Sequence, residues 1–216
     1  MQIIEVERKI IARNDEIAKE NRRFFEKKGV YVYNLLSSPG AGKTSILERI
    51  LERLKDKVNI GVMVGDVQTA NDAERLDKYN IQVVQIITNG GCHLNSMMIK
   101  NGISKINFDS IDVLFIENVG NLVCPSNFDL GENCRIVITS TTEGDDKPLK
   151  YPPIFHSANV LIINKIDLLP YLPANINEIK NNSLKINPKV KIFEVSALDG
   201  TGIDGLCNWI TGNVRR

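Results

Sequence analysis

The hydrophobic positions of this chain follow two periodicities in turn. Short continuous apolar runs, such as Val-Leu-Phe-Ile at 113–116, are typical of strands buried on both faces of a parallel sheet. Between these runs, apolar residues recur every three or four positions, which is the spacing of an amphipathic helix. The runs predict strands at 31–37, 58–64, 82–87, 113–116, 135–140, 160–164 and 191–195. The helical spacing predicts helices at 2–28, 42–55, 72–79, 95–101, 176–186 and 203–212.

The alternation of strands and helices indicates the fold class. It predicts an α/β fold, with a doubly wound, mostly parallel sheet of about seven strands, helices on both faces and one additional N-terminal helix. We therefore divide the chain into an N-terminal helical extension, 1–29, and a compact domain, 30–216.

The N-terminal helix carries two neighbouring apolar columns, and Gly29 ends it. We expect the columns to pack on the helix's own domain, with a coiled coil or a partner-binding arm as the alternative. The columns are Ile3, Ile10, Ile17 and Phe24, and Ile4, Ile11, Ala18 and Phe25.

The charge balance excludes some classes of partner. The 216 residues carry 27 basic and 26 acidic side chains, a formal net charge of +1. This balance gives no support for a nucleic-acid or membrane-surface partner, and we expect neither. No apolar run reaches the roughly 18–20 residues that span a bilayer. The N-terminal segment has no apolar signal-peptide core, so we expect a cytoplasmic protein.

A glycine-containing octapeptide follows the first predicted strand and opens a predicted helix, as a phosphate-binding P-loop does. Backbone N–H groups at a helix N-terminus can wrap phosphate oxygens, and Gly40 and Gly42 keep Cβ atoms out of their path. Lys43 adds a positive charge for the β- and γ-phosphates, and Thr44 adds a hydroxyl for Mg²⁺. Ser37 stands where such a loop usually begins with glycine. The loop is Ser37-Ser38-Pro39-Gly40-Ala41-Gly42-Lys43-Thr44, and the predicted nucleotide contacts are Ser38, Gly40, Ala41, Gly42, Lys43, Thr44 and Ser45.

Two motifs nearer the C-terminus predict that the base is guanine. In Asn164-Lys165-Ile166-Asp167, the Asp167 carboxylate can accept hydrogen bonds from the guanine ring N–H and amino group. Adenine lacks this donor pair, so such sites can discriminate by roughly 10⁴-fold. The Lys165 stem can lie on the base, and Asn164 would tie this loop to the phosphate loop. In Ser196-Ala197-Leu198, the Ala197 N–H would meet the guanine oxygen. The sequence therefore predicts GTP.

The expected catalytic groups lie at strand ends. Glu117 begins the motif Glu117-Asn118-Val119-Gly120, in which the acid can hold Mg²⁺ through water and the Gly120 N–H can reach the γ-phosphate. Asp66 follows another predicted strand and is assigned to Mg²⁺ or to the attacking water. With Lys43 these acids are the predicted catalytic residues, and with Thr44 they are the predicted magnesium ligands. No glutamine occupies the usual water-positioning place, so we expect slow hydrolysis by the isolated chain.

A pair of soft ligands forms a second candidate site. Cys92 and His93 follow the strand at 82–87, and Cys124 follows the Glu117 motif. Both loops leave carboxyl ends of predicted strands, so both belong on the nucleotide face of the sheet. Thiolate and imidazole suit Ni²⁺ or Zn²⁺, and a two-fold dimer could complete the site. From the residues alone, metal binding and a structural role both stay open. Cys134 and Cys207 are expected in the core.

Together these motifs resemble one family, the hydrogenase nickel-insertion GTPases of the HypB type, in the signal-recognition-particle/partitioning-like class of P-loop GTPases. The resemblance extends from about Asn21 onward. It also rests on Gly65-Asp66-Val67-Gln68-Thr69, Asp72-Ala73-Glu74-Arg75-Leu76, Gly91-Cys92-His93-Leu94, Asn121-Leu122-Val123-Cys124-Pro125, and Glu143-Gly144-Asp145-Asp146-Lys147-Pro148-Leu149-Lys150-Tyr151-Pro152.

The resemblance implies a nickel or zinc site at Cys92, His93 and Cys124 that bridges a GTP-dependent homodimer. It implies nucleotide contacts from Lys147 and Lys150, in a segment that composition alone would assign to a solvated loop. It also implies that 30–216 is the domain of a regulatory GTPase. Such a protein would release nickel to a hydrogenase large-subunit precursor or to a helper nickel metallochaperone.

Three alternatives stay open. A urease-type nickel GTPase has the same fold but carries Cys-Pro-His where this chain has Cys92-His93-Leu94. A small-molecule or protein kinase on this fold would need a phosphoryl-acceptor pocket, of which the sequence gives no sign. A metal-storage protein could keep the metal ligands beside a vestigial nucleotide site. Cys and His ligands suit both Ni²⁺ and Zn²⁺, so the residue types do not choose between these metals.

Overall fold

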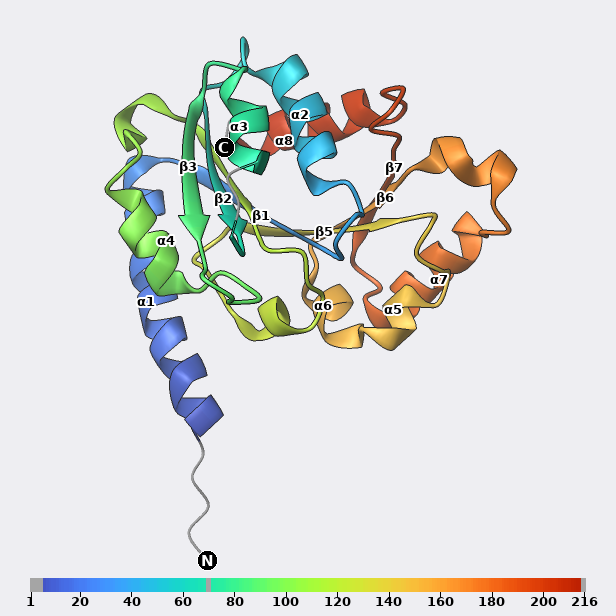
Figure 1. Ribbon diagram of the computed structural model, residues 1–216, viewed down its shortest axis with the longest axis horizontal. Helices are drawn as coiled ribbons and strands as arrows, with labels where there is room; N and C mark the ends of the chain where they lie inside the picture. The colour runs from blue at the N-terminus through green and yellow to red at the C-terminus, as the bar shows by residue number, and fades with distance from the viewer. Residues whose placement is uncertain (1–5, 69–70, 215–216) are drawn as a thin grey trace, which may run out of the picture.

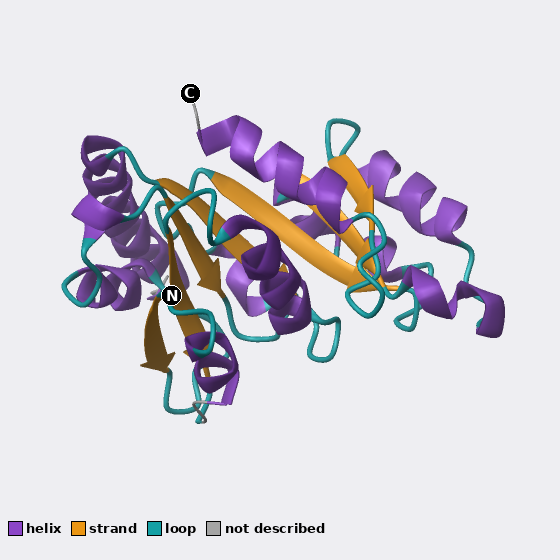
Figure 2. Cartoon of the chain, turned by 90° about the horizontal axis from the view of Figure 1, so that it is seen from above, coloured by secondary structure: helices purple, strands orange, loops and turns teal. Residues whose placement is uncertain are grey.

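The structure is a computed structural model that describes residues 6–68 and 71–214. Seven strands form one sheet in the order β3-β2-β4-β1-β5-β6-β7, and every neighbouring pair is parallel (Figures 1 and 2). The predicted α/β fold with a parallel sheet is therefore confirmed. The strands are β1 (Tyr31–Ser37), β2 (Ile60–Asp66), β3 (Gln82–Ile87), β4 (Val113–Glu117), β5 (Cys134–Ser140), β6 (Val160–Asn164) and β7 (Lys191–Glu194).

Helices cover both faces of this sheet. In Figure 1, α2, α3 and α8 lie on one side, whereas α1 and α4 to α7 lie on the other. The described helices are α1 (Val6–Lys28), α2 (Lys43–Leu54), α3 (Asn71–Asp77), α4 (Ser96–Ile103), α5 (Lys147–Lys150), α6 (Pro152–Ser157), α7 (Ile176–Ile186) and α8 (Ile203–Val214). Short 3-10 turns lie at Phe108–Ser110, Cys124–Asn127 and Ile166–Tyr171. Within the described ranges, no helix is both long and apolar enough to cross a membrane.

The core consists of apolar layers on the two faces of the sheet. Successive strand residues point to opposite faces, so Leu35 packs under α2 and α8 while Leu36 packs under α6 and α7. In the same way, Met63 of β2 faces α4. Because both faces are covered, β4 and β6 are buried along their whole length. This double burial explains the continuous apolar runs of the sequence.

The first helix packs on the domain through its second half. Ile17, Ala18 and Phe25 are buried, whereas Ile10 is 54% exposed. Gly29 follows the helix with φ +68°, and the Val30 N–H bonds to a carbonyl of the last turn, so glycine ends the helix as predicted. Packing on the helix's own domain is thus confirmed from Ile17 onward. Ile3 and Ile4 lie outside the described residues.

Some predicted boundaries were wrong. The strand predicted at 58–64 runs from Ile60 to Asp66, because the Val58 N–H still bonds to Leu54 O at the end of α2. The segment at 147–150 is the short helix α5 rather than a solvated loop. Proline stands in the first turn of α5 and of α6, where a missing N–H costs nothing.

Candidate functional site

The phosphate loop connects β1 to α2 at the carboxyl edge of the sheet. Gly40 and Gly42 have φ +76° and φ +97°, a region that glycine adopts without strain. A Cβ on Gly42 would collide with the Asn164 side-chain amide. Among the described residues, no side chain caps the first turn of α2, so its N–H groups face the loop and are suited to an anion.

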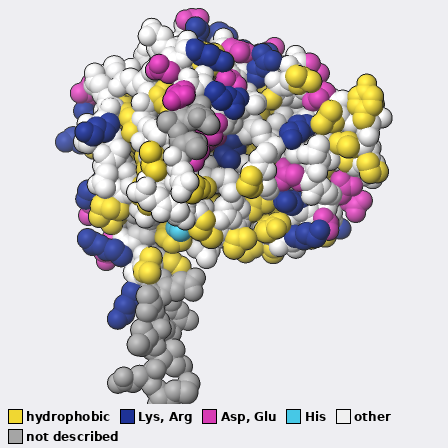
Figure 3. Space-filling view, viewed as in Figure 1, with side chains coloured by type: hydrophobic (Ala, Val, Ile, Leu, Met, Phe, Trp, Pro, Cys, Tyr) yellow, Lys and Arg dark blue, Asp and Glu magenta, His cyan; other side chains and the backbone are white. Residues whose placement is uncertain are grey.

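A cavity of about 650 Å³ opens at this loop. Figure 3 shows basic and acidic side chains gathered around a hollow over the first turn of α2. Lys43 Nζ donates to Ser37 Oγ at 2.9 Å, and burial lowers the pKa of Lys43. Among the described residues, the buried Ser38 Oγ has no hydrogen-bond partner. The lining includes Gly40, Gly42, Lys43, Thr44, Ser45, Asp66, Asp72, Arg75, Glu117 and Gly120.

Oxygen donors gather at one end of the cavity. Thr44 Oγ1 donates to Glu117 Oε1 at 2.6 Å, whereas Glu117 Oε2 is buried and lacks a partner within the described part of the chain. Burial raises the pKa of Glu117 to about 7. Asp66 ends β2 and lines the same cavity. A hydroxyl and two carboxylates beside a phosphate loop fit Mg²⁺, which prefers oxygen ligands and phosphates.

Gly120 brings the segment after β4 against the phosphate loop. A Cβ on Gly120 would lie 3.1 Å from the Pro39 backbone, which is tighter than ordinary contact. Glycine at this position therefore lets the main chain approach the place where a terminal phosphate would lie. Thr69, which the resemblance included, lies outside the described residues.

A second cavity, of about 500 Å³, adjoins the first at Gly42, Ser45 and Lys165. Asn164 Nδ2 donates to Ala41 O at 2.8 Å, which confirms that this loop is tied to the phosphate loop. Ser196 Oγ donates to Asp167 Oδ1 at 2.6 Å. Of the predicted base contacts, Ser196 does not line this cavity, whereas the remaining five do: Asn164, Lys165, Asp167, Ala197 and Leu198. The structure thus brings both predicted guanine motifs together beside the phosphate loop.

Cys92, His93 and Cys124 also come together. Their ligand atoms all lie within 4.8 Å of one another. Cys92 is exposed, and the other two are half-buried, with the His93 ring 4.0 Å from the Phe128 ring between centroids. Burial lowers the pKa of His93, which favours the neutral ring that a metal needs. The hydrogen bond with Cys124 raises the pKa of the Cys92 thiol. Cys134 and Cys207 are buried in the core, as predicted.

A phosphate loop, two guanine motifs and a Cys-His-Cys cluster therefore share one edge of the sheet. Residues 31–194 match the family described as CobW/HypB/UreG, nucleotide-binding domain. The chain belongs to the HypB group of this family. It is 46% identical to the hydrogenase maturation factor HypB of Rhizobium leguminosarum bv. viciae, over 100% of this chain and 72% of that protein. It is 44% identical to HypB of Escherichia coli (strain K12), over 97% and 72% of the two chains.

Solved HypB structures agree with this assignment. HypB from Helicobacter pylori, in complex with nickel, has a TM-score of 0.90 and 38% identity, covering 94% of this chain and 95% of that one. HypB from Archaeoglobus fulgidus has a TM-score of 0.88 and 39% identity, covering 94% and 99%. The HypB resemblance and the P-loop fold predicted from the sequence are thus confirmed.

Two residues expected from the HypB resemblance lie elsewhere. Lys147 Nζ is 3.5 Å from Glu143 Oε2, and Lys150 Nζ is 2.7 Å from Asp146 Oδ2. Neither lysine lines the phosphate cavity or the base cavity. Both belong to α5, which packs against α7. Their contact with a nucleotide stays a prediction.

Two asparagines that were not predicted as site residues join the two sites in this HypB-group chain. Asn121 Nδ2 donates to Cys92 O at 3.3 Å, and Asn121 Oδ1 accepts from the Val123 N–H at 2.8 Å. Asn118 makes a similar link to Leu94. Both asparagines stand in the quoted motif beside Glu117 and Gly120. Their spacing was visible, but their partners are backbone groups that carry no sequence signal.

Proposed function

We propose that this HypB-group protein is a GTP-hydrolysing metallochaperone that inserts nickel during maturation of [NiFe] hydrogenase. One observation carries the proposal. The Cys92, His93 and Cys124 ligand atoms lie within 4.8 Å of one another, and Cys124 lies seven residues after Glu117 of the phosphate cavity. The names of the relatives, and nickel in the Helicobacter pylori structure, support the same reading.

The nucleotide in this proposal is GTP. Asp167 would accept from the guanine N–H and amino group, and the Ala197 N–H would donate to the guanine oxygen. Lys43 and the N–H groups of α2 would hold the phosphates, and the Gly120 N–H would meet the γ-phosphate. Thr44, Asp66 and Glu117 would hold Mg²⁺, which neutralises charge on the phosphates when bound.

Three ligands from one chain leave a four-coordinate site incomplete. A second copy of the chain could complete it, since Cys92 is exposed at the surface. We therefore assign the nickel site to a homodimer that forms when GTP is bound. A helper nickel metallochaperone and a hydrogenase large-subunit precursor are the proposed recipients, and the cytoplasm is the proposed location.

Coupling between the two sites follows from ordinary linkage. If GTP and GDP favour different positions of the segment after Glu117, the metal ligands that move with it bind nickel with different affinities. Hydrolysis then lowers nickel affinity and releases the ion. Slow turnover by the lone chain suits a regulatory device of this kind, because the bound state lasts until the recipient arrives.

Native mass spectrometry of the full chain with nickel tests the proposal. With a non-hydrolysable GTP analogue, we expect more dimer and more bound nickel than with GDP. His93→Ala should abolish nickel binding in both states. His156→Ala is the matched control, because His156 is exposed and is not one of the three clustered ligands, and it should behave as wild type. An unchanged dimer fraction and unchanged nickel content would defeat the proposal.

The same samples separate the alternatives. A GTPase releases free phosphate, whereas a kinase leaves a phosphorylated acceptor. Lys43→Ala removes the charge that the phosphates need, so nickel release should lose its dependence on GTP. Nickel delivery that continues unchanged in Lys43→Ala would instead support a metal-storage protein.

A further inference from the structure

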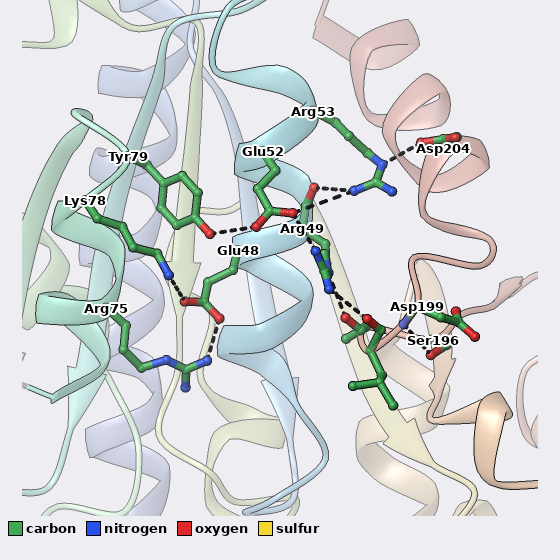
Figure 4. A network of polar contacts seen from close by, with 12 residues as sticks. Glu48, Arg49, Glu52, Arg53, Arg75, Lys78, Tyr79, Ser196, Asp199 and Asp204 are labelled. Atoms are coloured by element: carbon green, nitrogen blue, oxygen red, sulfur yellow. Dashed lines mark hydrogen bonds and ion pairs between the residues drawn. The ribbon is translucent and has the colours of Figure 1, made fainter.

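The loop that carries Ser196, Ala197 and Leu198 is held by an arginine from α2, 148 residues earlier in the chain. Arg49 Nε donates to Ala197 O at 2.7 Å, and Arg49 Nη2 donates to Leu198 O at 2.7 Å (Figure 4). Both acceptors are main-chain carbonyls, and a guanidinium donates stronger hydrogen bonds than a neutral group does. The pair of bonds therefore fixes two successive peptide groups beside the base cavity.

Arg49 is itself held in place. Arg49 Nη1 donates to Glu52 Oε2 at 2.9 Å, and the Tyr79 hydroxyl donates to Glu52 Oε1 at 3.1 Å. Arg53, one turn further along α2, binds Asp204 of α8 and no carbonyl at 196–198 (Figure 4). The two arginines share a helix and a similar exposure, but of the two only Arg49 donates to the carbonyls of Ala197 and Leu198.

The consequence for base recognition is electrostatic. A guanine O6 carries partial negative charge, so it requires an N–H donor and is repelled by a carbonyl oxygen. Arg49 engages the carbonyls of Ala197 and Leu198, while Ser196 O accepts from the Gly200 N–H at 2.9 Å. The Ala197 N–H instead donates to Asn164 Oδ1, on the side of the base cavity, at 3.1 Å.

We propose that Arg49 is a positioning residue for guanine recognition: by holding the carbonyls of Ala197 and Leu198, it keeps the Ala197 N–H at the base cavity, where guanine O6 would replace Asn164 Oδ1 as its acceptor. This inference rests on the proposed use of GTP. The helix α2 then contributes to both parts of the site, because it begins at Lys43 of the phosphate loop and also carries Arg49. One helix then orients the groups that meet both ends of the nucleotide.

The test combines two variants with three nucleotides. Full-length wild type, Arg49→Ala and the matched control Arg53→Ala are titrated with GTP, inosine triphosphate and 6-thioguanosine triphosphate. Wild type is also titrated with ATP. Inosine keeps O6 but lacks the amino group that Asp167 would bind. Thioguanosine keeps that amino group and the ring N–H, but it presents sulfur, a weak acceptor, in place of O6.

Arg49→Ala should weaken GTP and inosine triphosphate by about tenfold each, and thioguanosine triphosphate by less than about twofold. Arg53→Ala should change none of the three by more than about twofold. Equal weakening of all three nucleotides by Arg49→Ala would indicate general loosening of α2 and overturn the inference, as would no weakening. Wild type that does not prefer GTP to ATP would overturn the proposed function itself, which is a distinguishable result.

Discussion

Asn118 Oδ1 accepts a hydrogen bond from the Leu94 N–H at 3.0 Å, which joins the segment after β4 to the loop that carries His93. The same oxygen accepts from the Val119 N–H at 2.9 Å. Leu94 has no room to shift toward β2, because even a Cβ on Gly65 would overlap its side chain. This contact is the route by which the proposed movement of the Glu117 segment would reach the metal loop.

We expect Asn118→Ala to uncouple nickel affinity from the nucleotide. In wild type, the ratio of nickel affinities with a GTP analogue and with GDP measures the coupling, which is typically about 5- to 150-fold. Without the Asn118 oxygen, the Leu94 N–H loses its link and this ratio should approach one. Nickel titrations by calorimetry in the two nucleotide states give the ratio directly.

The ratio is internally controlled, because both affinities come from the same preparation and a fraction of inactive protein cancels. Asn101→Ala, an exposed asparagine of α4, should keep the wild-type ratio. If Asn118→Ala also keeps it, the bond to Leu94 does not carry the coupling.

The buried Glu117 predicts a pH-dependent stability of the protein without nucleotide. Burial raises the pKa of Glu117 from 4.5 to about 7 in the folded chain. Between these two pH values, Glu117 stays protonated in the folded chain but is ionised in the unfolded chain. The stability contribution is fully present below pH 4.5 and is lost as pH rises through about 7. We expect wild type to lose about 3 kcal/mol relative to Glu117→Gln across this window.

Urea unfolding in chelator, at intervals between about pH 5 and about pH 8, checks this expectation. Glu117→Gln stays neutral and can still accept the Thr44 hydroxyl. His93 is present in both proteins, so subtracting one stability curve from the other cancels its contribution. That contribution has the opposite dependence on pH, because the pKa of His93 is lowered. Parallel stability curves for the two proteins would contradict a raised Glu117 pKa.

Most of the fold could be predicted from the sequence, because strands that are buried on both faces of the sheet appear as continuous apolar runs. β4 and β6 are buried at every position, and their apolar runs stand out without any alternation. Boundaries were less predictable, since the end of β2 at Asp66 depends on pairing with Ile87 of β3. The helices α5 and α6 were not predicted, because proline is common in loops. Proline is nevertheless suited to the first turn of a helix, where it stands in both.

The candidate site was predictable where chemistry requires particular side chains. Asn164 and Asp167 are recognisable because few other residues could meet a guanine base. The proximity of Cys124 to Cys92 followed from both loops leaving carboxyl ends of strands. Arg49 could not be found in this way. Its acceptors are backbone carbonyls 148 and 149 residues distant, and any residue type supplies a carbonyl.

We expect Asp167→Asn to change the base preference from guanine to xanthine. An asparagine amide presents one donor where the carboxylate has only acceptors, and xanthine carries a carbonyl where guanine carries its amino group. GTP affinity should fall by about 100-fold or more, while xanthosine triphosphate affinity rises. Displacement of a fluorescent GDP by each nucleotide measures both changes. Asp199→Asn, on the neighbouring loop, should keep the preference for GTP. A loss of GTP affinity with no gain for xanthosine triphosphate would place Asp167 away from the base.

The N-terminal helix makes a separate prediction about stability. Asn21 is almost fully buried, and its Nδ2 donates to Ser96 O at 2.8 Å and to Leu130 O at 3.1 Å. Asn21→Ala leaves both carbonyls with one bond fewer, so the free energy of unfolding should fall by about 2 kcal/mol. Asn101→Ala replaces an exposed asparagine of α4 and should change it by less than about 0.5 kcal/mol. Urea denaturation measures both. Equal small effects would mean that α1 adds little to the stability of the domain, and its buried polar contacts would then need another role.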